Sequence, residues 1–172
     1  MPTTHLIAVA ESAGPAVQHG VELLRDALVE RGRTAAATAL GEQVERPGAD
    51  AVLVVVGERS TPAIARLEQQ EWLLYTNGEP GLNGYYATML PGRVVVVTGA
   101  DANGVLYGCQ ELAALVRAHG EIPRDLDRGE TPDLELRGPA IGLQRTEVEP
   151  PRQVYEYPIT PDRFAWFYDR EL

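Results

Sequence analysis

Glycines between a strand and a helix are the first residues whose spacing suggests chemistry. The segment 94–108 reads VVVVTGADANGVLYG, a valine run followed by a glycine turn and a helical pattern. This order can place backbone N–H groups around a phosphate, as in dinucleotide-binding folds. Here, however, Gly99, Gly104 and Gly108 are spaced by five and four residues, and Leu106 stands where close backbone approach requires glycine. No strand with an acidic end follows about 20 residues later. A Rossmann-like nucleotide binder therefore remains an alternative.

Acidic residues and histidines are present, but their positions do not suggest a catalytic pair or a metal site. Asp101 follows the valine run and is expected to cap the helix that starts near Gly104, or to shape the turn before it. The three histidines, His5, His19 and His119, are isolated in the sequence. No spacing typical of a zinc site or of a Ser-His-Asp arrangement appears. We predict no catalytic residue, no metal site and no cofactor in this chain.

Composition excludes several further classes of protein. All 15 basic residues are arginine, and the absence of lysine excludes a P-loop, a Schiff-base lysine and a pyridoxal enzyme. The single cysteine, Cys109, excludes an internal disulfide, and its place on an apolar stripe predicts a buried thiol. A net charge of -10 argues against nucleic acid and anionic membrane surfaces as partners. We expect neither a membrane span nor a signal peptide in this sequence, which leaves its localisation open.

Hydrophobic patterning predicts the elements around the glycine turn. β-branched runs favour strands, and apolar residues at spacings of three and four favour amphipathic helices. The pattern predicts an α/β (α+β) fold, a mixed sheet of about five strands with two or three packed helices and an irregular Pro-rich tail. The first half of the chain is predicted to form a strand at 5–10, a helix from Pro15 to Gly32, a weak strand at 33–40 and a strand at 51–56 that Gly57 stops. A helix at 61–70 follows, and residues 72–75 continue it or form a short strand. The last predicted elements are a hairpin of 85–90 and 93–98, joined by Pro91 and Gly92, and a helix that Gly120 ends.

The central third of the chain resembles the accessory α/β domain that precedes the catalytic barrel in several glycoside hydrolase families. The resemblance is to domain 2 of β-N-acetylhexosaminidases and to the similar domains of α-glucuronidases and hyaluronidase-like enzymes. It is carried by residues 84–85, 94–99 and 100–112, with 122–123 and 136–138 where such proteins leave the domain and enter the barrel. It implies an accessory domain at 1–122 and, at 123–172, a connector and the start of a barrel that is missing here. Catalytic acids lie in that barrel, so this chain is expected to be non-catalytic.

The same resemblance suggests one substrate-binding residue and several partners. Arg137 is similar to the arginine on the first barrel strand that binds sugar hydroxyls in hexosaminidases, although a solvated or ion-paired arginine is the simpler interpretation. Tyr85, Tyr86, Trp72 and Tyr75 can form a sugar-stacking platform or cover the core. A helix starting at 160–162 carries four aromatic residues (164 and 166–168) that require a partner surface. The expected partner is the catalytic barrel of the same parent protein, and the alternative is a freestanding carbohydrate-binding or oligomeric module that self-associates through this aromatic helix.

Overall fold

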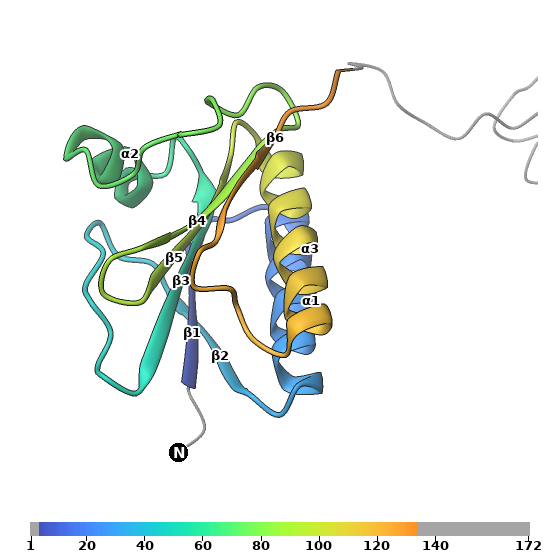
Figure 1. The fold of residues 1–172 in the computed structure, drawn as a ribbon. Coiled ribbons are helices and arrows are strands. Elements are labelled where there is room, and N and C mark those ends of the chain that lie inside the picture. Colours follow the sequence, from blue (N-terminus) through green and yellow to red (C-terminus); the bar gives the residue numbers. More distant parts are fainter. Residues whose placement is uncertain (1–3, 134–172) are drawn as a thin grey trace, which may run out of the picture. The chain divides into compact units, whose positions relative to one another are not determined.

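A computed structural model describes residues 4–133 of the chain. These residues form six strands and three helices, in an order that confirms the predicted α/β fold (Figure 1). The strands are β1 (Thr4–Val9), β2 (Thr34–Ala39), β3 (Ala51–Glu58), β4 (Tyr85–Leu90), β5 (Val94–Gly99) and β6 (Asp127–Glu130). The helices are α1 (Pro15–Glu30), α2 (Pro62–Gln69) and α3 (Ala102–His119).

The strands form one mixed sheet in the order β2-β1-β3-β5-β4-β6. The first four of these are parallel, while β4 runs antiparallel to both of its neighbours. The sixth strand, β6, lies in a segment that the sequence predicts as a connector. Its sequence, DRGE, has no apolar residue that would indicate a strand. Backbone pairing with β4 places it at the sheet edge, so the sheet continues beyond residue 122. The helix predicted from residue 160 and Arg137 lie outside the described residues.

Helices α1 and α3 lie side by side on one face of the sheet and cover the larger part of the core (Figure 1). Their stripes bury Leu24 and Leu28 from α1 and Leu112 and Val116 from α3 completely. The two helices approach closely at Gly20, where an added Cβ would lie 3.0 Å from the Cβ of Cys109. Cys109 is completely buried, which confirms the predicted buried thiol, and this burial raises its pKa to about 12.

The other face of the sheet is covered only in part. Helix α2 and the loop after it bury Ile64, Leu67 and Leu73 against β3, β5 and β4. On the same face, the β2 residues Thr34 and Ala36 are exposed. The weak strand predicted at 33–40 is therefore confirmed as an edge strand that contributes little to the core.

Three local predictions were wrong, each for a backbone reason. Strand β3 continues through Gly57, which pairs with Thr98 in β5. Residues 72–75 form neither helix nor strand, because Glu71 adopts a φ of 57° that ends the helical path. The connection between β4 and β5 has three residues rather than two, since Leu90 pairs with Val94 and both Gly92 and Arg93 have positive φ.

Candidate functional site

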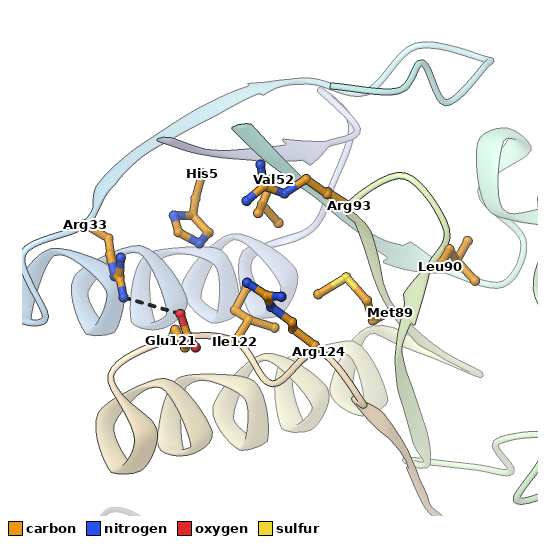
Figure 2. A pocket seen from close by; sticks show the side chains of 9 residues that line it. All are labelled: His5, Arg33, Val52, Met89, Leu90, Arg93, Glu121, Ile122 and Arg124. Atoms are coloured by element: carbon orange, nitrogen blue, oxygen red, sulfur yellow. Dashed lines mark ion pairs between the residues drawn. The ribbon is translucent and has the colours of Figure 1, made fainter. Parts of the chain in front are cut away.

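A pocket opens where the parallel strands β1, β3 and β5 begin, and we call it the basic pocket (Figure 2). Its volume is about 410 Å³. Its walls come from the starts of β1 and β3, the loop before β2, the β4–β5 hairpin and the connection that follows α3. The lining residues are His5, Arg33, Val52, Met89, Leu90, Arg93, Glu121, Ile122 and Arg124.

The floor of the basic pocket is apolar. Val52, Leu90 and Ile122 are buried, and Met89 is half-buried. Val52 belongs to the face of β3 that packs under α1 and α3, and Ile122 reaches the same core from the chain beyond α3. Leu90 belongs to the smaller core on the α2 face, so the pocket floor lies at the edges of both hydrophobic cores.

Arg33 joins the rim of the pocket to the end of α3. Its Nε and Nη2 atoms both donate to the Gly120 carbonyl oxygen at 3.2 Å, and Nη2 lies 3.6 Å from a Glu121 carboxylate oxygen. Gly120 has a φ of 80°, which confirms it as the left-handed cap predicted for this helix. A cation beside the last carbonyl groups of a helix is stabilising because the helix dipole is negative there. Arg33 therefore has a structural role.

Arg93 and Arg124 complete the basic rim. Arg93 follows Gly92 in the hairpin turn, has a φ of 66°, and donates to the Ala49 carbonyl oxygen. Arg124 is exposed. Among residues 4–133, no carboxylate lies within ion-pair distance of either guanidinium. Two cations without a counter-charge in the described chain thus line one pocket.

In a polar cluster at the end of the sheet opposite the basic pocket, one arginine binds two carboxylates. Arg59 donates to Glu68 at 3.0 and 3.2 Å and to Glu79 at 2.8 Å, and its guanidinium lies 4.9 Å from the ring centroid of Tyr75. Burial alone would raise the pKa of Glu68, but hydrogen bonds from Arg59 and Tyr75 outweigh it and hold this pKa below its usual value. A glycosidic general acid requires a raised pKa. Glu68 is therefore suited to holding Arg59 and Tyr75 in place rather than to acid catalysis.

Replacing Glu68 by glutamine should make stability less dependent on pH. Because the folded pKa is lowered, the charged form stabilises the fold above the ordinary carboxyl pKa, and this contribution is lost as pH falls through the folded value. We expect Glu68→Gln to cost about 1 kcal/mol near pH 7 and less near pH 3.5. Urea unfolding at both pH values measures the difference. Glu79→Gln is the control, because Glu79 is a more exposed partner of the same arginine, and it should change the unfolding free energy by less than about 0.5 kcal/mol. An equal loss of unfolding free energy from Glu68→Gln at both pH values would contradict the argument.

A second cluster fastens the loop of residues 70–84 to β6. The Tyr86 hydroxyl donates to Asp127 and lies 2.9 Å from the Thr76 hydroxyl, which donates to the other Asp127 oxygen at 2.5 Å.

Tyr85 and Tyr86 are buried, so they cannot belong to the sugar-stacking platform considered from the sequence. Trp72 is exposed, but an arginine, Arg46, already lies over its ring at 5.4 Å from the centroid.

The turn before α3 is closed by the chain itself. Asp101 accepts a hydrogen bond from the Gly104 amide at 2.9 Å and another from the Asn83 amide at 2.7 Å, which confirms its predicted capping role. The Gly84 carbonyl oxygen lies 2.0 Å from where a Cβ on Gly104 would be. These contacts fill the position that a phosphate would take, so the geometry disfavours a nucleotide site here.

Sequence reasoning missed the basic pocket. Its cations are single arginines in three separate connections, and no local spacing marks them as a group. Only the strand order brings them together.

No group of three or more histidine, cysteine or acidic side chains within residues 4–133 is placed to hold a metal ion. None of the described helices is long and apolar enough to span a lipid bilayer.

Comparison with known proteins places this fold within larger enzymes. No family model and no curated protein matches the chain. Among solved structures, a GH138 enzyme targeting the pectin rhamnogalacturonan II is 27% identical with a TM-score of 0.59, over 99% of this chain and 21% of that one. The chain resembles one part of a glycoside hydrolase. A family GH115 4-O-methyl-α-glucuronidase with specificity for decorated arabinogalactans is 19% identical with a TM-score of 0.50, over 67% of this chain and 14% of that one. The chain thus spans about a fifth or less of these enzymes' length.

Proposed function

We propose that this chain is a non-catalytic accessory domain of a glycoside hydrolase, of the kind that precedes the barrel in β-N-acetylhexosaminidases. Its role is to pack against and support a catalytic barrel of the same parent protein. The observation that carries the proposal is the match of nearly the whole chain to 21% of the GH138 enzyme. That enzyme targets a pectin, which supports a polysaccharide as the parent's substrate. The arginine-bound state of Glu68 and Glu79 agrees with a non-catalytic role.

An apolar loop beside the end of the described chain supplies a surface for the barrel. We define the exit loop as residues 70–84. It exposes three large apolar side chains, Trp72 by 49%, Leu74 by 61% and Leu82 by 62%. The Gly81 amide donates to the Thr131 hydroxyl at 2.9 Å, so the chain leaves β6 next to this loop. Figure 1 shows the loop beside the end of β6. We propose that the barrel packs on the exit loop, because the last described residues lie beside it.

The docking role is tested in the parent glycoside hydrolase with the double variant Leu74→Asp and Leu82→Asp. Burying two carboxylates in an interdomain contact is unfavourable, so we expect a lower melting temperature and lower hydrolytic activity of the parent. In this chain alone the same variant should change the unfolding free energy by less than about 0.5 kcal/mol. Val29→Asp is the matched control, because Val29 is 55% exposed on α1.

Two results would overturn the proposal. One is a coding sequence that holds no barrel after Leu172. The other is robust hydrolysis of aryl glycosides by the 172-residue chain alone, because no residue described here is assigned to that chemistry. The finer prediction for Arg137, and self-association through the aromatic residues 164–168, remain predictions to be tested in the same parent protein.

A further inference from the structure

The basic pocket carries a positive charge in a chain whose net charge is -10. Three arginines and one glutamate line it. Arg33 and Glu121 form an ion pair across 3.6 Å, and Arg33 is also bound to the end of α3, so this arginine is already committed. Arg93 and Arg124 remain, and no carboxylate of residues 4–133 pairs with them. Figure 2 shows them reaching the pocket from two different connections, with Val52 between them in the view.

The rest of the pocket suits a small organic anion rather than a hydrated inorganic ion. Its floor is formed by buried aliphatic side chains, including Val52 and Ile122, and its volume is about 410 Å³. Sites for small molecules have this size and combine apolar walls with a few placed polar groups. Guanidinium groups bind carboxylates through paired, charge-assisted hydrogen bonds. A sugar ring that carries a carboxylate presents both an apolar C–H face and an anion.

The backbone at Arg93 supports a role for its side chain. A φ of 66° is a left-handed conformation that glycine or asparagine adopts at lower cost than arginine. Arg93 nevertheless occupies this position, and its bond to the Ala49 carbonyl oxygen holds the side chain at the pocket rim. The turn geometry alone would favour glycine or asparagine at position 93. The positive charge at the pocket rim is therefore the better explanation for an arginine there.

The position of the pocket favours a ligand from solution over a docked domain. The pocket lies where β1, β3 and β5 begin, whereas β4 starts after the exit loop, with Tyr85 paired to Gly99 at the end of β5. The exit loop and the pocket are thus at opposite ends of β5. A contact at the exit loop would therefore not itself involve the pocket residues.

We propose that the basic pocket binds a uronate residue of an acidic saccharide, with Arg93 and Arg124 holding its carboxylate and the aliphatic floor contacting its ring. This inference rests on the proposed function, which makes a saccharide the available source of such a carboxylate. It assigns the proposed accessory domain a saccharide-binding site.

Calorimetric titration of the full 172-residue chain with trigalacturonate tests the proposal. We expect saturable binding at low ionic strength that weakens as salt is added, because the charges are close to solvent. The methyl ester of the same trisaccharide keeps its size and rings but lacks the charge, and should bind at least about tenfold more weakly. Equal binding of acid and ester, or no saturation by either, would overturn the inference.

Variants locate the binding within the chain. Arg124→Gln and Arg93→Asn should each weaken trigalacturonate binding by about tenfold or more. Asparagine tolerates positive φ, so Arg93→Asn should leave the urea midpoint unchanged or slightly higher and separates lost binding from lost folding. Arg25→Gln, at an exposed arginine of α1, is the matched control with unchanged affinity. Unchanged affinity in both pocket variants would place the binding elsewhere and contradict the proposal.

Two further ligands distinguish the source of the anion. Sulfate binding as tightly as trigalacturonate would show a general anion site, and a short Asp/Glu peptide binding more tightly would show a site for an acidic protein segment; either result overturns the saccharide assignment. These outcomes are separable from failure of the proposed function. A parent protein without a barrel, combined with uronate binding by this chain, would remove the accessory role and leave the pocket in a freestanding module.

Discussion

Replacing Gly104 by alanine should destabilise the chain by about 3 kcal/mol or prevent it from folding. The new Cβ would lie 2.0 Å from the Gly84 carbonyl oxygen and 2.9 Å from its carbonyl carbon. Both are backbone atoms, so no side-chain rotation can relieve the clash. Moving α3 away from the start of β4 would also break the hydrogen bonds that join Asn83 to Asp101 and Asn103. The better helix propensity of alanine, worth up to about 1 kcal/mol, only partly offsets this loss.

Urea unfolding followed by circular dichroism and by tryptophan fluorescence measures the effect of Gly104→Ala. Gly48→Ala is the matched control, because no atom lies within 4 Å of the Cβ that it would add. We expect the control to change the unfolding free energy by less than about 0.5 kcal/mol. A similarly small effect of Gly104→Ala would show that the close approach of α3 and β4 is not required for folding.

The elements with a strong local signal could be predicted from the sequence. The valine runs of β3 and β5 are buried on both faces, and such strands read as continuous apolar stretches. Helix α3 has an apolar stripe, an Asp101 cap and a Gly120 stop, all of which act within a few residues. Strand β6 has no such signal. It is held by backbone pairing to β4 and by the bond from the Met89 amide to the Leu126 carbonyl oxygen, which depend on tertiary structure.

The candidate site could not be predicted in the same way. Arg93 and Arg124 are separated by 31 positions, and each looks like an ordinary surface arginine in its own segment. Their approach depends on the parallel pairing of β3 with β5 and on the return of the chain after α3. The predicted site residue, Arg137, was instead suggested by resemblance to a known family and lies outside the described residues. Local patterns thus identified the scaffold, whereas the pocket depends on the arrangement of loops at one end of the sheet.

Leu112→Ala should cost about 2–5 kcal/mol, because it removes a completely buried side chain from the core that α1 and α3 build on the sheet. Leu74→Ala is the control, since the same change at a 61% exposed leucine should cost less than about 0.5 kcal/mol. Both are measured by urea unfolding.

The same variant separates stability from binding. Ile122 belongs to the core that contains Leu112 and also lines the basic pocket. If the domain unfolds as one unit, Leu112→Ala should weaken trigalacturonate binding only by the fraction of chains that are unfolded, whereas Arg124→Gln should weaken it in a fully folded chain. A Leu112→Ala protein that stays folded with a loss below about 1 kcal/mol would contradict the close packing of α3 against the sheet.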